Sequence, residues 1–363
     1  MTVHSFDEWS PLREVIVGSA VNHPEHAREL SFDLFFHDNL VYDRARVPRR
    51  SAPIKPRYLA ELIEDVEGMA HALASLSIKV HRPLPLDSAA EIRALAWSAT
   101  AIPPLNIRDN TLIAGDEIIE TPPLVRSRYF ENQFLAPIFG EYFRAGARWT
   151  VMPRPLMTDA SFDISYAETS AEPLDSINAR RPSPYDVGHE MMFDGAQCLR
   201  FGRDMIANVA TANHALAVDW LERHLAGRIR VHRVHRLSGN HIDTMVLPLR
   251  PGTLLVRGEK VADLLPASLQ KWDLIIPPPP ENTPRYEEND LILASPYIDL
   301  NVLSISPDTV LVNAESTGLI RTLERHRFTV VPVRHRHGRL FGGGLHCFTL
   351  DTVRAGEPES YLD

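Results

Sequence analysis

The segment CLRFGRDMIANVATANHALAVDWLERHLAGRIRVHRV, residues 198–234, contains the pattern that decides the fold. It begins with a β-rich run at 198–201, continues with apolar residues at helical spacing over 213–225, and ends in a second β-rich run at 229–234. Such a unit is too small to bury the apolar faces of its own strands. The segment therefore predicts one element of a larger, repeated α/β assembly.

The same order of elements occurs five times along the 363 residues. The other four predicted units lie at residues 13–81, 111–152, 253–276 and 310–333, and their helices are expected at 58–76, 130–146, 260–270 and 318–326. The units begin and end with similar composition and include no polar capping unit, which a linear stack would need. We therefore predict a single α/β domain spanning residues 1–363, in which five units close into a pseudosymmetric propeller.

Composition and charge narrow the class of partner. Apolar residues make up 44% of the chain and charged residues 23%, which is typical of a globular protein. The formal net charge is -9 and the basic residues are scattered, so no nucleic-acid surface is expected. The densest basic stretch, residues 334–339, is interpreted as a solvated or substrate-facing loop. No apolar run of 18 residues occurs, so we expect no membrane span and a small-molecule partner.

The N-terminal residues, the cysteines and the histidines predict the compartment of the protein, the state of its thiols and whether it binds a metal. Residues 1–9 include His, Asp and Glu where a secretory signal has a basic start and an apolar core, so a cytoplasmic protein is expected. Cys198 and Cys347 are then expected to be free thiols, and Cys198 is assigned to the core. No Cys-x-x-Cys or His-Glu-x-x-His motif occurs, so neither a metal nor another cofactor is expected.

Reactive side chains recur at intervals of about one unit. The separations are 47 residues from Asp194 to His241, 54 from His241 to Ser295 and 52 from Ser295 to Cys347. Asp109 precedes the first predicted strand of the second unit. Equivalent loops of units related by rotation converge on one mouth of the ring. We therefore expect these residues to meet there.

Cys347 follows three glycines, 342–344, which permit a tight turn and close approach of the backbone to a ligand. A nucleophilic thiolate there needs a neighbouring cation or general base. His241 is the candidate base, with Asp194 as the carboxylate beside it. The alternative is that Cys347 is a small buried apolar residue and that His241 and Asp194 are structural.

Asp243 lies two residues after His241, so in an extended segment both side chains point to one side. Several carboxylates facing one cavity favour a cationic substrate, because paired charge lowers the cost of desolvating either partner. The pattern indicates a guanidinium or ammonium substrate.

An ordered set of motifs resembles the arginine amidinotransferases, the family that includes glycine amidinotransferase and the inosamine-phosphate amidinotransferase of streptomycin biosynthesis. The motifs are EWSPLREVIVG at 8–18, IIETP at 118–122, RSRYFE at 126–131, FDGA at 193–196, HID at 241–243 and GGGLHC at 342–347. The resemblance spans nearly the whole chain. It implies the five-bladed α/β propeller called the pentein fold, which agrees with the repeat count.

The resemblance also implies roles for individual residues. Cys347 would be the nucleophile, His241 the general acid and base, and Asp194 the carboxylate beside them. Asp109 and Asp243 would hold the guanidinium, and Ser295 would contribute to substrate binding. In the implied reaction, the thiolate attacks the guanidinium carbon of arginine and ornithine leaves. The resulting amidino-cysteine then reacts with an amine.

Three departures from the family pattern concern the acceptor. Lys260 stands where glycine-using members have an arginine that receives a substrate carboxylate, and it offers a point charge instead of a bidentate fork. Asn240 replaces a methionine before the histidine, and Ala294 replaces one serine of a pair. These departures predict an acceptor amine other than glycine, in specialised-metabolite biosynthesis.

Two other functions remain open on the sequence alone. Water could reach the amidino-cysteine in place of an amine, which would give a deiminase or dihydrolase. The chain could also bind guanidinium compounds without reacting with them. The sequence does not identify the acceptor or the oligomeric state, and a homodimer is among the options.

Overall fold

The computed structural model describes residues 2–26, 28–36, 54–88, 90–162, 190–280, 286–287 and 290–362. These ranges contain five three-stranded sheets of one topology and a separate two-stranded hairpin. In each three-stranded sheet the first and middle strands are antiparallel, and the third runs parallel to the middle one. A helix connects the middle strand to the third, so the predicted mixed α/β fold is confirmed.

Each of the five sheets is built from three strands and one connecting helix. The first contains β17 (Thr349–Arg354), β1 (Leu12–Val17) and β2 (Lys79–His81), with helix α3 (Pro56–Ser75). The second contains β5 (Thr111–Ala114), β6 (Glu117–Glu120) and β7 (Arg148–Val151), with α4 (Ala136–Arg144). The third contains β8 (Cys198–Phe201), β9 (Asp204–Val209) and β10 (Arg230–His235), with α7 (Ala212–Leu225). The fourth contains β11 (Val246–Arg250), β12 (Thr253–Val256) and β13 (Asp273–Ile275), with α8 (Glu259–Ala262), and the fifth contains β14 (Leu303–Ser306), β15 (Thr309–Asn313) and β16 (Thr329–Val333), with α9 (Thr317–Arg325).

Each sheet has one strand more than the sequence pattern predicted. The predicted units began at the first strand in the second and third sheets but at the middle strand in the fourth and fifth. The whole of β9 was missed, although all six of its residues are buried. Its sequence, DMIANV, includes Asp204 and Asn208, whose polar side chains disguise a strand that is buried throughout.

Two predicted helices are shorter than expected. The helix predicted at 260–270 is wrong: α8 ends at Ala262, and a 3-10 turn follows at Leu269–Lys271. Pro266 lies between them, and proline lacks the N–H that a continuous helix needs. The helix predicted at 130–146 is split into a 3-10 turn and α4, which has Pro137 in its first turn, where proline is tolerated.

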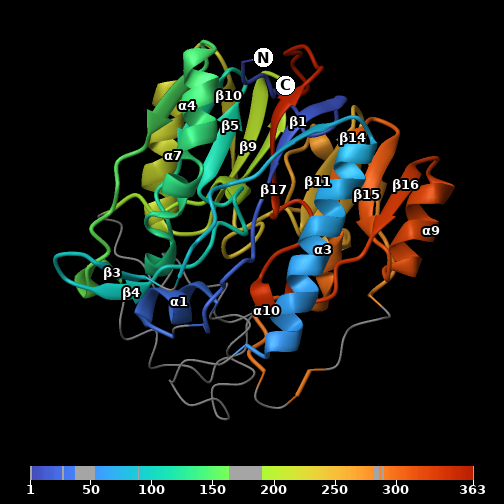
Figure 1. Ribbon diagram of the computed structural model, residues 1–363. Helices are drawn as coiled ribbons and strands as arrows, with labels where there is room; N and C mark the ends of the chain where they lie inside the picture. The colour runs from blue at the N-terminus through green and yellow to red at the C-terminus, as the bar shows by residue number, and fades with distance from the viewer. Residues whose placement is uncertain are drawn as a thin grey trace.

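Helices α3, α4, α7 and α9 lie outside the strands, and the two chain termini lie together at one end of the molecule (Figure 1). The opposite end contains α1 (Leu30–Phe35), α10 (Gly338–Phe341) and the hairpin of β3 (Glu91–Arg93) and β4 (Ser98–Thr100). None of the helices within the described ranges is both long and apolar enough to cross a membrane.

Candidate active site

A cavity of about 310 Å³ lies beside α1 and the end of α10. Its lining includes five of the residues selected from the sequence, which are Asn240, His241, Asp243, Ser295 and Cys347. They come from segments more than 100 residues apart in the chain, from Asn240 to Cys347. The structure therefore brings together most of the predicted site.

The glycine-rich turn places Cys347 at this cavity. Helix α10 ends at Phe341 and is followed by the capping residue Gly342, which has a φ of +67° and so adopts the left-handed conformation that glycine favours. A Cβ at Gly344 would approach the side chain of Asn301 to 2.5 Å, so a larger residue could not occupy that position without a shift. The same Asn301 accepts a hydrogen bond from the Cys347 amide at 2.8 Å, and this bond fixes the backbone of the candidate nucleophile.

The thiol of Cys347 is buried, with 2% exposure, and lies 3.4 Å from Oδ2 of Asp243. Burial raises the pKa of the thiol well above its usual value, and the charges of Asp243 and Asp109 raise it further. In the unliganded protein the sulfur is therefore protonated at neutral pH. A bound cation that offset the two carboxylates would favour the thiolate.

His241 contacts two carboxylates. Its Nε2 donates to Oδ2 of Asp194 at 2.8 Å, and its Nδ1 lies 3.9 Å from Oδ1 of Asp109, beyond hydrogen-bond distance. Burial opposes the charged ring, but Asp109 and Asp194 outweigh it and raise the pKa of His241 to about 9. The ring is therefore an imidazolium at neutral pH, with Nδ1 available for proton transfer.

Local backbone contacts hold Asp194 and Asp109 side by side. Asp194 caps the 3-10 turn at Gly195–Gln197 in a reciprocal capping box with Gln197. The Gly195 amide donates to the carbonyl of Asp109, and a Cβ at Gly195 would lie only 2.6 Å from a neighbouring carbonyl oxygen. Arg128 donates to Oδ2 of Asp109 at 2.5 Å. Burial is nevertheless the largest influence on Asp109 and raises its pKa.

Three buried carboxylate oxygens of this cluster have no hydrogen-bond partner among the described residues. They are Oδ1 of Asp109, Oδ1 of Asp194 and Oδ1 of Asp243. An unsatisfied buried acceptor costs about 1–3 kcal/mol, and more when it is charged. Three such atoms in one cluster indicate a site prepared for a cation that donates hydrogen bonds.

A metal ion is the simplest such cation to consider. Ligand atoms of Asp109, Asp194 and His241 lie within 4.8 Å of one another. A metal on either ring nitrogen of His241 would need that nitrogen deprotonated, and on Nε2 it would also replace the hydrogen bond donated to Asp194, whereas Asp109 and Asp194 keep the ring protonated. An organic cation with several N–H groups leaves that bond intact and satisfies the free oxygens. The donor set therefore fits a guanidinium better than a metal.

His346 holds the carboxylate that faces the thiol. Its Nδ1 donates to Oδ2 of Asp243 at 2.9 Å, and the side-chain amide of Asn301 donates to the carbonyl of Asp243 at 3.3 Å. Burial alone would raise the pKa of Asp243, but the hydrogen bond and charge of His346 lower it. Asp243 is therefore ionised beside Cys347.

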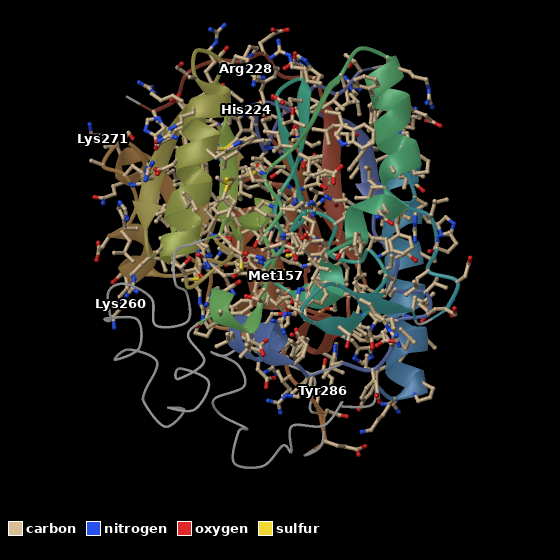
Figure 2. The ribbon with its side chains drawn as sticks, turned by 90° about the vertical axis from the view of Figure 1, so that its left-hand side faces the viewer. Met157, His224, Arg228, Lys260, Lys271 and Tyr286 are labelled. Carbon is tan, nitrogen blue, oxygen red and sulfur yellow. The ribbon has the colours of Figure 1, made fainter. Side chains whose placement is uncertain are left out.

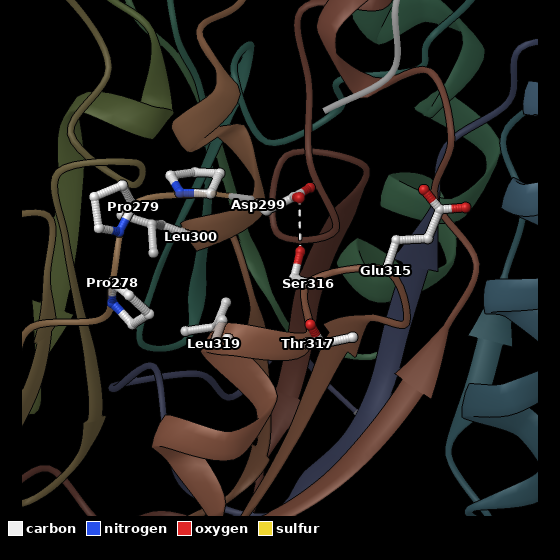
Figure 3. A pocket seen from close by; sticks show the side chains of 10 residues that line it. Pro278, Pro279, Asp299, Leu300, Glu315, Ser316, Thr317 and Leu319 are labelled. Carbon is white, nitrogen blue, oxygen red and sulfur yellow. Dashed lines mark hydrogen bonds between the residues drawn. The ribbon is translucent and has the colours of Figure 1, made fainter. Parts of the chain in front are cut away.

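Ser295 and Asn240 also line the cavity that contains this cluster. Ser295 precedes the 3-10 helix η6 (Pro296–Leu300), which is tied to the start of α9 where Asp299 accepts the hydroxyl of Ser316 at 2.6 Å (Figure 3). The side-chain oxygen of Asn240 accepts from the His241 amide at 2.7 Å. Hydrogen bonds thus hold the segments in which both residues lie.

Lys260 is not brought to the site. It lies on α8 with an exposed side chain at the outer surface, and it does not line the cavity (Figure 2). The buried residues of α8 are Val261 and Ala262, so this helix packs on the core through these residues and not through Lys260. Arg257, three residues earlier, lines the cavity instead.

Sequence reasoning missed Arg257, Asn301 and His346. His346 was adjacent to the candidate nucleophile, so its position was a usable signal. Asn301 contacts Cys347 across 46 residues and Asp243 across 58, and nothing local in the chain marks either contact.

Comparison with known proteins identifies the family. No protein-family model matches the chain. It is 33% identical to inosamine-phosphate amidinotransferase 1 of Streptomyces glaucescens, over 99% of both chains. It is 30% identical to the mitochondrial glycine amidinotransferase of Xenopus laevis, over 99% of this chain and 85% of that protein. The solved structure of SxtG, an amidinotransferase of the saxitoxin biosynthetic pathway from Microseira wollei, superposes with a TM-score of 0.84 at 31% identity over 99% of both chains. The chain belongs to the amidinotransferases, enzymes that transfer a one-carbon group.

Proposed function

We propose that this enzyme transfers the amidino group of L-arginine, through a covalent intermediate on Cys347, to a primary amine other than glycine in specialised metabolism. The observation that carries the proposal is the set of three unpaired carboxylate oxygens beside a buried thiol. The guanidinium of arginine is a planar cation with five N–H donors. This arrangement of donors suits paired carboxylates.

Substrate binding would activate the nucleophile. The guanidinium replaces the missing hydrogen bonds of Asp109, Asp194 and Asp243 and offsets the negative charge that raises the thiol pKa. The carboxylate oxygen of Asp243 is the atom in contact with the thiol and can accept its proton. The thiolate would therefore form only when the carbon it attacks is in place.

The first half-reaction forms a sulfur–carbon bond at Cys347 and breaks the bond between that carbon and the side-chain nitrogen of arginine that ornithine retains. The imidazolium of His241 gives a proton from Nδ1 to the departing amine, so ornithine leaves and a cationic amidino-cysteine remains. The proton lost by the thiol balances the one gained by the amine. Asp194 holds the ring through Nε2 during this exchange.

The second half-reaction reverses these steps with a different amine. The neutral His241 takes a proton from the incoming amine as its nitrogen attacks the amidino carbon, and the Cys347 thiol is regenerated. Two of the three departures that predicted a non-glycine acceptor concern the cavity itself, because Asn240 and Ala294 line it whereas Lys260 does not. Their positions support a changed acceptor.

We also propose that the five sheets close into the ring of a single domain. Shared core clusters support this closure. One cluster joins the first and second sheets, another the second and third, a third the third, fourth and fifth, and a fourth the fifth and first. The pairing of β1 with β17 joins the two ends of the chain within one sheet.

The test supplies L-arginine labelled at the guanidino carbon together with a panel of primary amines that includes glycine. The expected result is a labelled guanidino product and one equivalent of ornithine with a non-glycine amine. Release of labelled citrulline or urea without any amine would show hydrolysis instead. Equal or better transfer to glycine would contradict the predicted acceptor class.

A further inference from the structure

Two adjacent aromatic residues, Phe35 at the end of α1 and Phe36 directly after it, line the cavity that contains Cys347 and His241. Both side chains are only partly buried. Polar groups elsewhere in the lining suit a cationic substrate, but these two rings offer it neither a charge nor a conventional hydrogen bond. The binding of a guanidinium therefore leaves them without a role.

The two rings lie beside the two reacting side chains. The ring centroids of Phe35 and His241 are 5.3 Å apart and the ring planes meet at 65°, which is an edge-to-face arrangement. Phe36 packs on the glycine-rich turn before Cys347, because a Cβ at Gly342 would come within 3.1 Å of its ring. One ring therefore lies against the candidate base, and the other lies against the turn that carries the nucleophile.

Asn240 joins Phe35 to His241 through both ends of its side-chain amide. Its Nδ2 donates to the carbonyl of Phe35 at 3.3 Å, and its Oδ1 accepts from the amide of His241 at 2.7 Å. Asn240 is one of the departures from the family pattern, in place of a methionine. A thioether has no N–H to donate, so a methionine would not form this bridge.

The other end of α1 is held as well. Glu29 caps the helix by accepting from the amides of Ser31 and Phe32. The hydroxyl of Ser31 accepts from the amide of Arg126 at 2.9 Å, and Nη1 of Arg126 lies 3.4 Å from a carboxylate oxygen of Glu29. Helix α1 is therefore fixed at both ends, which makes Phe35 a positioned part of the cavity.

The proposed intermediate requires protection from water. Once ornithine has left, the amidino-cysteine is an electrophile and neutral His241 is a base, and both would serve water as well as an amine. Attack by water forms a carbon–oxygen bond, breaks the carbon–sulfur bond and releases urea, and the two protons of the water end on Cys347 and His241. Water is far more abundant than any amine, so transfer depends on keeping it from this carbon.

We propose that Phe35, held against His241 by Asn240, excludes water from the amidino-cysteine and thereby directs the reaction to transfer instead of hydrolysis. This inference rests on the proposed function. A water molecule beside the ring gains no hydrogen bond in place of those that it leaves in solution. An amine brings carbon atoms next to its nitrogen, and these gain by covering the aromatic surface. Phe36 extends this surface towards the nucleophile.

The test follows the decay of the intermediate. The enzyme is loaded with L-arginine, freed of arginine and ornithine by gel filtration, and incubated in isotopically labelled water without any amine. Intact-mass spectrometry measures the remaining amidino adduct, and urea is measured in the same samples. The wild-type adduct should persist, whereas Phe35→Ala should lose its adduct at least about 10-fold faster and release labelled urea in equal amount.

Asn240→Leu is the second variant, because it retains the aromatic ring and a side chain of similar volume but removes both hydrogen bonds. Its adduct should also decay faster than the wild-type adduct, by a smaller factor than in Phe35→Ala. Phe143→Ala is the matched control, since Phe143 is an exposed phenylalanine on α4, and its adduct should decay at the wild-type rate. Decay is timed after the adduct has formed, so a slower first half-reaction does not alter the result.

Decay at the wild-type rate in Phe35→Ala and Asn240→Leu would overturn the proposal. Faster loss of the adduct without labelled urea would also overturn it, because water would not be the attacking group. Equal acceleration in Phe143→Ala would show that the effect is not specific to Phe35. Acceleration in Phe35→Ala alone would retain the role of the ring and overturn that of Asn240. Absence of any adduct on the wild-type enzyme would instead contradict the proposed function, and this inference would fall with it.

Discussion

Two buried clusters of charge lie next to each other in this enzyme, and they differ in how completely their carboxylates are paired. In the first, Glu8 accepts two hydrogen bonds from one edge of the Arg200 guanidinium, from Nε at 2.8 Å and from Nη2 at 2.7 Å. Asp351 accepts from Arg200, Arg108 and Arg354. These arginines hold the pKa of Asp351 well below its usual range against the effect of burial.

The second cluster is the one at the candidate active site, with Asp109, Asp194 and Asp243. Arg128 donates to one of these aspartates, and each of the three keeps one oxygen without a partner among the described residues. Similar burial thus produces two outcomes. A cluster whose charges are matched within the protein is expected to stabilise the fold, whereas we propose that the substrate supplies the positive charge that the other cluster lacks.

His346 joins the two clusters. Its Nδ1 contacts Asp243 at 2.9 Å and its Nε2 contacts Glu8 at 3.4 Å. The paired cluster can therefore serve as the rigid support against which the unpaired cluster is positioned. Mutations in the paired cluster should therefore mainly reduce stability, and mutations in the unpaired cluster should mainly reduce activity.

The largest expected effect is on stability, from Asp351→Asn in the paired cluster. This change leaves three buried arginines short of a counter-charge, so the free energy of unfolding should fall by about 3–5 kcal/mol. Urea denaturation measures the loss. The exposed Asp308→Asn is the control and should change stability by less than about 0.5 kcal/mol. A similarly small loss for Asp351→Asn would mean that the pairing does not stabilise the fold.

In the unpaired cluster, Asp243→Asn should reduce the rate of amidino-cysteine formation about 100- to 1000-fold, because it removes an anchor of the guanidinium and the acceptor of the thiol proton. Stability should fall by less than it does in Asp351→Asn, because Asp243 loses mainly its hydrogen bond with His346, whereas Asp351 is paired with three arginines. Single-turnover kinetics and denaturation measure the two quantities. A loss of stability comparable to that of Asp351→Asn would erase the distinction between the clusters.

The pH dependence of stability sharpens the comparison further. His241 has a folded-state pKa of about 9 against 6.5 when unfolded, so protonation of this ring stabilises the fold fully below pH 6.5. That contribution is lost as the pH rises towards 9, and it amounts to at most about 3 kcal/mol. Denaturation at pH 6 and pH 9.5 should show a decrease that His241→Gln abolishes. A decrease of equal size in His241→Gln would assign it to other groups.

The smallest expected effect comes from His346→Gln, at the junction. Loss of the ring removes the hydrogen bond and charge that lower the pKa of Asp243, so the acidic limb of the pH–rate profile should move to higher pH. The rate at pH 8 should fall only about 10-fold. An unchanged profile with reduced stability would show that His346 is merely structural.

Most of the site could be predicted because its residues occur in compact motifs. The glycines before Cys347 and the pair of His241 and Asp243 are local patterns with a physical meaning. Lys260 was misplaced because it is exposed on α8, and the sequence alone does not show which side of that helix faces the cavity. Asn301 could not be found, since its role arises only from packing between distant segments.

The errors in the fold have a similar physical cause. Five units were visible because each includes a helix between strands of high β-propensity. The boundaries of the units were wrong because one strand of each sheet was missed. Strand β9 is an example, since it includes the polar residues Asp204 and Asn208, whose hydrogen bonds are formed only in the folded chain. Burial is a tertiary property, and periodicity alone does not reveal it.

The most direct test of the central claim is mass spectrometry of the intact enzyme after mixing with L-arginine alone, with Cys347→Ala as the control. We predict an adduct of amidino mass on the wild-type enzyme, with release of ornithine, and none on the variant. An unmodified wild-type enzyme, or an adduct that persists in Cys347→Ala, would contradict the claim that the unpaired carboxylates prepare this cavity for a covalent reaction at Cys347.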